Sequence, residues 1–189
     1  MTREEQKEQR QRQIMMKALE LFVTKGYSET KISDIAGALG ISMGLMFHYY
    51  ESKEHLYKEL VKTGAAYSSR PEAIKFTNAA EYFDKTLTGL FAAIKAEPMI
   101  YHMFVLMSQA RRQGIPGEIR EIALSVDQMK FSANVIEQGQ REGCIREGDP
   151  MALSFTFWCA VQGIMEQHMI TPEIPLPDKQ WLLDIILKK

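Results

Sequence analysis

Side chains that can donate hydrogen bonds or carry charge stand close together between Thr30 and Lys53. Ser42 and Tyr49 carry hydroxyls, His48 carries an imidazole, and Lys53 carries a charged amine. Such groups donate to phosphate oxygens and to the edges of bases. No nucleophile paired with a base, no carboxylate cluster and no phosphate-cradling glycine loop is recognisable in the sequence, so we expect a protein that is not an enzyme.

Two short helices and a turn are predicted to hold these side chains. Apolar residues in 32–39 fall on one face of a short helix, and Gly40 follows where the chain must turn. Ser42 can cap a second short helix over 43–50, and a third helix opens at 52–54. Two short helices joined through a glycine-containing turn are the sequence form of a helix-turn-helix. The core of this unit is predicted to include Ile35, Ala36, Leu39 and Tyr50.

The order of residue types is more specific than that motif. It reads Gly26-Tyr27, Thr30, Ile35-Ala36, Leu39-Gly40-Ile41-Ser42, Gly44, Phe47-His48-Tyr49-Tyr50 and Lys53-Glu54-His55-Leu56. This order resembles the DNA-binding domain of the TetR family of transcriptional regulators over about residues 10–62. The resemblance implies an all-α fold with an N-terminal three-helix DNA-binding domain, placed at 1–62. A C-terminal helical domain for effector binding and dimerisation is placed at 63–189, and the chain is expected to form about nine helices.

Five positions depart from the family's usual run. Leu39 stands for alanine, Ile41 for valine, Phe47 for tyrosine, Tyr49 for histidine and Tyr50 for phenylalanine. Phe47 lacks the hydroxyl that reaches phosphate in similar proteins, so any contact it makes is packing against sugar. Tyr49 can still donate through its own hydroxyl.

In a helix-turn-helix the second helix enters the major groove, which places residues 42–49 there. Met43 and Leu45 are expected to contact thymine methyl groups, and His48 is expected to hydrogen-bond a base edge. Two apolar residues offer few bidentate contacts, so sequence preference is expected to lean on DNA shape. Gly44 lets the backbone approach the DNA, although a turn glycine without that role is the alternative.

Phosphate contacts are expected on both flanks of this helix. Lys53 combines a cation with the positive end of a helix, and Thr30 and Lys31 stand likewise at the start of an earlier one. The predicted DNA-binding residues are Thr30, Lys31, Ser42, Met43, Gly44, Leu45, Phe47, His48, Tyr49 and Lys53. The polar tip at 1–13 is expected to fray before a helix begins near Ile14. Its cations Arg3, Lys7, Arg10 and Arg12 could reach phosphates, but a solvated charged face fits them as well.

Composition alone points to no special partner. The 189 residues are 46% hydrophobic and 25% charged, with a net charge of −1, which is ordinary for a globular protein. Any claim about DNA therefore depends on where the cations sit. The two cysteines, the lack of a secretory pattern at the start and the lack of a long apolar run lead us to expect a cytoplasmic protein with reduced thiols and no membrane association.

Beyond residue 71 the apolar periodicity predicts only helices. They are expected over 79–96, 99–113, 118–142, 150–169 and 178–188. The helix that opens at 53 is expected to end near 63 and to loosen from Gly64 onward. No segment alternates like a strand, and no repeat stands out.

One reading head covers few base pairs, so a homodimer with heads about 34–36 Å apart is favoured. The resemblance implies an interface built from the last two helices. Candidates are Phe155, Trp158, Val161, Gln162, Met165, Trp181 and Ile185, with intramolecular core as the alternative for the same residues.

The resemblance also implies a small-molecule effector bound in the C-terminal domain. The methionines and aromatic residues there suit an apolar or amphipathic compound, because methionine adapts to irregular shapes. Candidates are Phe83, Phe91, Met103, Phe104, Met107, Met129 and Trp158, each of which could equally be core. His102 and His168 lack paired spacing, and the two cysteines form no CxxC, so no metal or cofactor is expected.

Together these expectations describe a ligand-responsive transcriptional regulator. Its expected partners are double-stranded DNA, a second copy of itself and a small effector. The favoured form is a repressor that binds a palindromic operator as a dimer and is released by the effector. An activator of the same fold, or a helical scaffold that does not bind DNA, remains the alternative.

Overall fold

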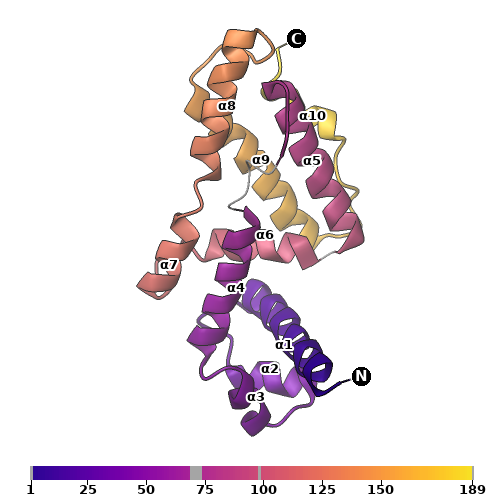
Figure 1. The fold of residues 1–189 in the computed structure, drawn as a ribbon, viewed down its shortest axis with the longest axis vertical. Coiled ribbons are helices and arrows are strands. Elements are labelled where there is room, and N and C mark those ends of the chain that lie inside the picture. Colours follow the sequence, from indigo (N-terminus) through magenta and orange to yellow (C-terminus); the bar gives the residue numbers. More distant parts are fainter. Residues whose placement is uncertain (1, 69–73, 98, 189) are drawn as a thin grey trace. The chain divides into compact units, whose positions relative to one another are not determined.

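Ten helices, and no strand, form the described part of the computed structural model, which covers residues 2–68, 74–97 and 99–188 (Figure 1). The helices are α1 (Arg3–Lys25), α2 (Ile32–Leu39), α3 (Met43–Tyr49), α4 (Lys53–Ser68), α5 (Ala79–Ala96), α6 (Met99–Gln109), α7 (Gly117–Leu124), α8 (Gln128–Glu142), α9 (Pro150–Ile170) and α10 (Lys179–Leu183). The prediction of an all-α fold with an N-terminal helix-turn-helix is confirmed.

The chain divides into two compact units. The first unit combines Met1–Ala66 with His102–Ser125, and the second combines Tyr67–Tyr101 with Val126–Lys189. The first unit therefore holds α1 to α3, most of α4 and α6, and α7. The division into functional domains at 62/63 remains a prediction, because compactness alone does not assign a role to either part.

The leading end of α1 is helical from Arg3, where the sequence predicted a frayed tip. The Thr2 hydroxyl accepts a hydrogen bond from the Glu5 amide at 3.2 Å, and the Glu5 carboxylate accepts one from the Thr2 amide at 2.7 Å. This reciprocal capping box satisfies two amides that a frayed end would leave to water. The prediction of a frayed tip is therefore wrong, and α1 reaches well beyond the core that its later turns bury.

An aromatic cluster forms the centre of the three-helix head. Phe22 and Tyr57 are fully buried, with ring centroids 4.8 Å apart in an edge-on arrangement, and Tyr27 lies 4.7 Å from Tyr57. Burying each such ring stabilises the head by about 1.5–3 kcal/mol. Burial also raises the pKa of Tyr57, so its hydroxyl stays protonated. The core therefore fixes α1 and α4 on the two helices of the reading unit.

Helix α4 runs straight through Gly64, where the sequence predicted that it would loosen. A methyl group at Gly64 would lie 2.6 Å from the Met107 sulfur and 2.8 Å from the Met103 sulfur. Both distances are shorter than real contacts of this kind, so glycine is needed here for the close approach of α4 and α6. The predicted end of the helix near residue 63 is wrong, because packing overrides the weak helix propensity of glycine.

The predicted helix over 118–142 is two helices. Helix α7 ends at Leu124, and α8 begins after Asp127, whose side chain accepts a hydrogen bond from the Lys130 amide at 3.0 Å. Val126 between them is buried, so the apolar repeat continues through the break. Capping by Asp127 starts a new helix where periodicity alone suggested continuity.

The second unit is built around the packing of α8 on α9. The Trp158 indole N–H donates to the Ser132 hydroxyl at 2.8 Å, which satisfies two buried polar groups. The last helix is much shorter than the predicted 178–188, since α10 ends at Leu183. Beyond it the chain pairs with residues after α8, where the Lys188 amide donates to the Cys144 carbonyl at 3.0 Å.

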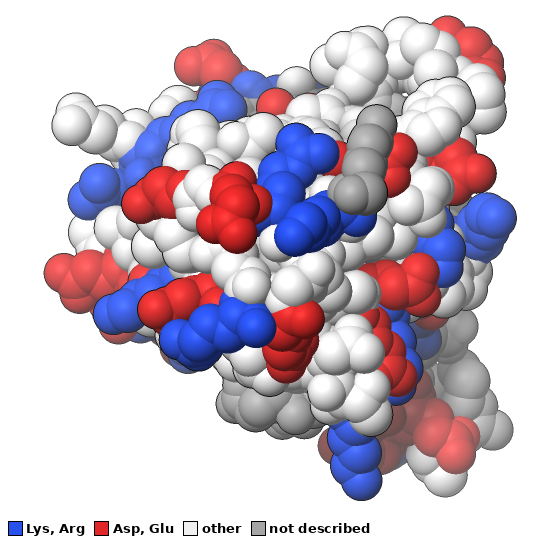
Figure 2. Space-filling view, turned by 90° about the horizontal axis from the view of Figure 1, so that it is seen from above, with Lys and Arg blue, Asp and Glu red and all other residues white. Residues whose placement is uncertain are grey.

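Charge is mixed on the face displayed in Figure 2, where basic and acidic side chains lie beside one another without a large area of one sign. Among the described residues no single helix has both the length and the apolar character needed to cross a membrane, although the bent pair α5 and α6 passes that test together.

Candidate DNA-binding interface

The turn between α2 and α3 is fixed by backbone geometry. Gly40 adopts the left-handed conformation at φ +62° and ψ 32°, and its amide donates to the Gly37 carbonyl at 3.1 Å. The Ile41 amide donates to the Ala36 carbonyl at 3.0 Å, which completes a glycine-based helix end. The Ser42 hydroxyl then accepts from the next helix's first turn, as predicted. These contacts set the angle at which α3 leaves α2.

One side of α3 is anchored and the other is open. Met46 is fully buried and Tyr50, just after the helix, is 5% exposed, so these two residues fix α3 on the head. On the open side Met43 and Leu45 are each 37% exposed and Phe47 is 47% exposed. Three large apolar side chains on one short exposed helix are costly in water, which favours a surface that meets a partner.

Gly44 lies on the same open side of α3. The nearest atom to a methyl group built there would be the Ser42 hydroxyl oxygen at 3.9 Å, an ordinary contact distance. Packing within the chain therefore does not require glycine at this position. A close approach by another molecule would require it, which is the role that the sequence predicted. His48 is exposed beside it, and Tyr49 is half-buried between α3 and α1.

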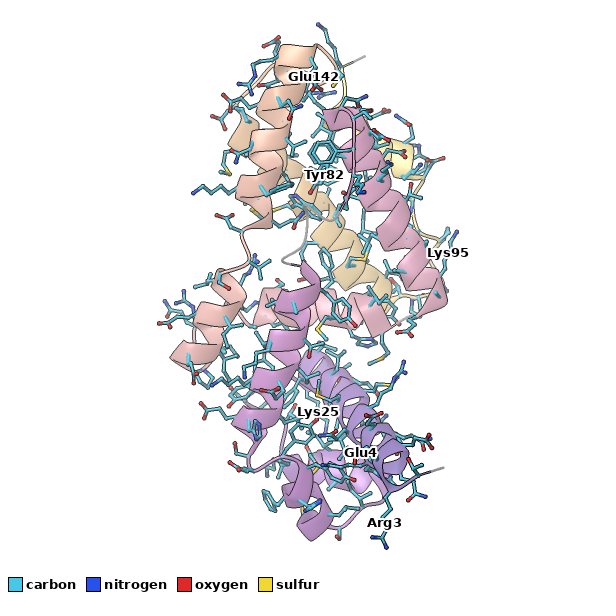
Figure 3. The ribbon with its side chains drawn as sticks, in the orientation of Figure 1. Arg3, Glu4, Lys25, Tyr82, Lys95 and Glu142 are labelled. Atoms are coloured by element: carbon cyan, nitrogen blue, oxygen red, sulfur yellow. The ribbon has the colours of Figure 1, made fainter. Side chains whose placement is uncertain are left out.

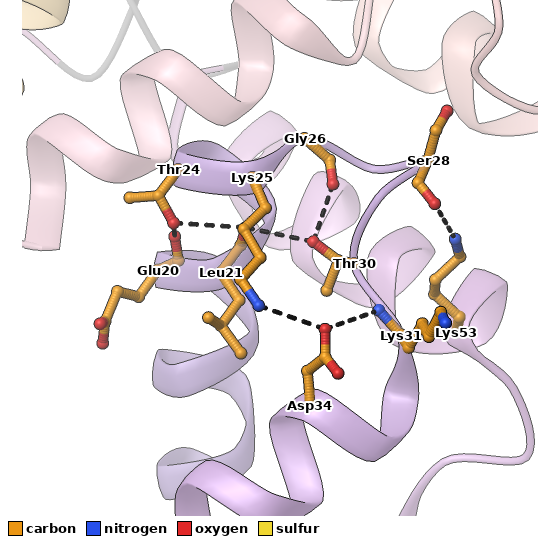
Figure 4. Close-up of polar contacts among 10 residues, drawn as sticks. All are labelled: Glu20, Leu21, Thr24, Lys25, Gly26, Ser28, Thr30, Lys31, Asp34 and Lys53. Atoms are coloured by element: carbon orange, nitrogen blue, oxygen red, sulfur yellow. Dashed lines mark hydrogen bonds and ion pairs between the residues drawn. The ribbon is translucent and has the colours of Figure 1, made fainter.

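Lys53 joins the start of α4 to the loop before α2. Its ammonium donates to the Tyr27 carbonyl at 2.8 Å and to the Ser28 carbonyl at 3.3 Å, and it lies 4.4 Å from the Tyr27 ring centroid (Figure 4). An ammonium has three N–H donors, so two are engaged within the chain and one is left for phosphate. Lys53 is thus held in place rather than free to sweep the surface.

Thr30 supports the site from beneath. It is fully buried, and its hydroxyl donates to the Gly26 carbonyl at 2.7 Å, with the Leu21 carbonyl at 3.2 Å (Figure 4). A side-chain contact between Thr30 and phosphate, expected from the sequence, does not fit this burial. Its hydroxyl instead ties the loop before α2 to the end of α1.

Lys31 is exposed at the start of α2, where its charge remains available. Asp34 on the next turn accepts from the Lys25 ammonium at 3.2 Å and from the Lys31 amide at 3.4 Å. The hydrogen bond from Lys25 is the main reason that the pKa of Asp34 lies below its ordinary value. Lys25 therefore offsets the one carboxylate near Lys31 and limits the negative field facing a phosphate.

The predicted effector residues do not come together in one compact unit. Met103, Phe104 and Met107 belong to the first unit, whereas Phe83, Phe91, Met129 and Trp158 belong to the second. Phe83, Met107 and Trp158 are 0%, 7% and 8% exposed, which is typical of core. The effector set remains a prediction, and most of its buried members already have a packing role.

The predicted dimer residues separate into two groups on α9 and after it. Trp158, Val161 and Met165 are 8%, 0% and 0% exposed, so they pack within the chain. Phe155 is 56% exposed and Trp181 is 70% exposed. Gln162 and Ile185 are half-buried. The exposed side of α9 also carries Met151 and Ile170 at 47% and 67%, which the sequence analysis missed because α9 is apolar on all sides.

Comparison with known proteins agrees with this geometry. The family model of bacterial regulatory proteins of the tetR family matches residues 14–60. The transcriptional repressor KstR2 of Mycobacterium tuberculosis is 26% identical over 157 residues, which is 78% of this chain and 75% of that protein. The relatives found by sequence include no close homologue at this level, so the likeness is one of family and not of individual role.

Solved structures give the same fold over nearly the whole chain. The MbdR regulator of Azoarcus sp. CIB superposes with a TM-score of 0.78 at 22% identity and covers 92% of this chain and 95% of its own. The ketosteroid transcriptional regulator KstR2 of Mycobacterium tuberculosis superposes with a TM-score of 0.72 at 22% identity, covering 95% and 96%. These proteins are regulators, and the structural likeness extends through the second unit as well as the reading head.

Proposed function

This chain belongs to the TetR family of bacterial regulatory proteins through its helix-turn-helix domain, and we propose that it is a ligand-responsive repressor that binds a palindromic operator as a homodimer. The observation that carries the proposal is the open side of α3. Met43, Leu45 and Phe47 are exposed there around a glycine that packing does not require. A major groove admits one helix, and apolar side chains meet thymine methyl groups within it.

The polar residues around α3 support docking on the duplex backbone. Lys31 on one flank and Lys53 on the other each present a cation near the start of a helix. Ser42 and Tyr49 add hydroxyls at the two ends of α3, and His48 adds a ring nitrogen that can contact a base edge. Contacts of the first kind set register, and contacts of the second kind read sequence.

A dimer follows from the size of a single head and from the exposed side of α9. Phe155, Met151 and Ile170 leave this helix with apolar surface on the side opposite its packing on α8. Trp181 of α10 adds a further exposed aromatic ring. Homodimer interfaces are rich in such residues and isologous in form. The buried candidates Trp158, Val161 and Met165 then act by holding α9 in shape.

The proposed effector is a small apolar or amphipathic compound that binds the second unit. The chain has 12 methionines, and a related regulator carries ketosteroid in its description, which fits a ligand of this class. Release from DNA requires the effector to bind more tightly to the arrangement that does not fit the operator. The protein is proposed to act in the cytoplasm, where the DNA is, and to carry no enzymatic activity or cofactor.

Selection of duplexes from a random pool tests the proposal directly. The wild-type chain is expected to enrich palindromes with half-sites about one helical turn apart, and its binding is expected to weaken steeply with salt. Leu45→Ala is expected to change the enriched sequence. Leu124→Ala is the matched control, because Leu124 is a leucine of similar exposure, at 48%, on α7. Recovery of no symmetric sequence, or the same sequence from Leu45→Ala, contradicts the assignment of α3 as the reading helix.

A further inference from the structure

Three cations and one core residue share a single face of α1. Arg3, Lys7, Arg10 and Ile14 follow one another at the i, i+4, i+7 and i+11 spacing that keeps side chains on one side of a helix. Ile14 is fully buried in the head. The face that packs on the core in the later turns of α1 therefore continues as a basic stripe in its first turns, beyond the end of that core.

The basic stripe lines a groove with the reading helix. The groove, of about 410 Å³, is lined by Arg3, Gln6, Lys7, Gln9, Arg10, Gln13 and Tyr49. No carboxylate lines it, and among the described residues none of the three cations has an ion-pair partner. The amides of the glutamines and the hydroxyl of Tyr49 add neutral donors. In Figure 3, Arg3 extends from the foot of α1 at the end of the head where α3 lies.

Arg12 does not belong to this surface. It lines a separate groove on the other side of Tyr49, together with Glu59 and His55. A carboxylate in that second groove opposes a phosphate. The sequence had grouped Arg12 with the other three cations, but only Arg3, Lys7 and Arg10 share the face that borders α3.

We infer that the first turns of α1 bind the DNA backbone next to the segment that α3 reads, with Arg3, Lys7 and Arg10 as phosphate contacts. This inference rests on the proposed function and extends its footprint. Arg3 and Arg10 lie about 10 Å apart along the helix axis at 1.5 Å per residue. One strand presents a phosphate about every 3.4 Å along the duplex axis, so the stripe spans about three phosphates. Tyr49 links the two surfaces, because it closes the groove from α3.

The test replaces Arg3, Lys7 and Arg10 together by glutamine, which removes charge while keeping helix propensity. The control replaces Lys95, Lys130 and Arg141, three exposed cations of the second unit, by glutamine, so net charge falls equally (Figure 3 labels Lys95). Affinity for a duplex selected by the wild-type chain is measured by fluorescence anisotropy across a salt series. Circular dichroism of each variant reports whether α1 remains helical.

The groove variant is expected to bind the selected duplex about 10- to 100-fold more weakly than the control. Its logarithmic salt slope is expected to fall by about 2.7, at about 0.9 per lost phosphate contact. Hydroxyl-radical footprints are expected to lose protection beside the region read by α3. A groove variant that retains helicity and matches the control in affinity and slope overturns the inference but leaves the proposed function standing. Failure of the wild-type chain to select any duplex overturns the proposed function itself, and the inference with it.

Discussion

The ammonium of Lys53 lies 2.8 Å from the carbonyl oxygen of Tyr27 and 4.4 Å from the centroid of the same residue's ring. This one contact joins the start of α4 to the loop that precedes α2. It fixes a cation on the flank of the reading helix at a defined position. A positioned cation loses less freedom on meeting a phosphate than a mobile one, so this contact relates the fold directly to the proposed docking.

Lys53→Ala is expected to weaken binding to all DNA sequences alike, because a phosphate contact carries no sequence information. The logarithmic salt slope is expected to fall by about 0.9. Lys62→Ala is the matched control, since Lys62 lies on the same helix and its exposed side chain pairs with Glu59. Binding isotherms at several salt concentrations measure both quantities. An unchanged slope for Lys53→Ala shows that this cation faces no phosphate.

Gly139→Ala is expected to destabilise the second unit. A methyl group there would lie 2.3 Å from a side-chain carbon of Ile145 and 2.5 Å from the Cβ of Ala79, so α8 must shift. Overpacking of this kind costs about 1–3 kcal/mol, more than the gain of about 1 kcal/mol from helix propensity. Gly89→Ala on α5 meets nothing within 4 Å and is expected to be neutral or stabilising. Urea unfolding of both variants gives the comparison, and equal stability contradicts the packing described.

Local sequence signals predicted some elements to the residue and failed at others for identifiable reasons. The bounds of α5 follow from a regular apolar repeat that Asn78 caps. The repeat also runs through buried Val126, so periodicity hid the break between α7 and α8. Only the capping contact of Asp127 marks it.

The site residues show the same division between local and tertiary information. Gly40 and Ser42 act within one turn, so their roles could be predicted from type and spacing. Thr30 looked like a surface hydroxyl at the start of a helix, but the end of α1 covers it. The basic face of α1 became specific only when Tyr49 was seen to close the groove beside it. Contacts between distant segments decide these roles, and spacing along the chain does not report them.

Glu81 is expected to titrate at about 2, far below an ordinary glutamate at 4.5. The carboxylate accepts from Lys85 and from both the amide and the hydroxyl of Thr77, the last two at 2.6 Å, and these hydrogen bonds favour its charged form. A lowered folded-state pKa stabilises the fold above the unfolded value. That contribution is lost as pH falls from about 4.5 to about 2. Carboxyl NMR titration measures the value, and a Thr77→Val/Lys85→Met variant is expected to raise it. An unchanged pKa in that variant contradicts the assigned cause.

Phe155→Glu is expected to separate the proposed dimer. Phe155 is 56% exposed on the open side of α9, and a carboxylate placed there meets its own copy across a twofold axis. Loss of a central aromatic contact typically costs 2 kcal/mol or more, so the dimer dissociation constant is expected to rise by about 30-fold or more. Binding to a palindromic duplex is expected to fall with it, whereas binding to a single half-site is expected to stay the same. Ile174→Glu introduces the same charge at a similarly exposed residue, at 53%, outside the helix, and is expected to leave the dimer intact. Analytical ultracentrifugation of both variants decides the point, and a Phe155→Glu chain that sediments as a dimer assigns the interface to another surface.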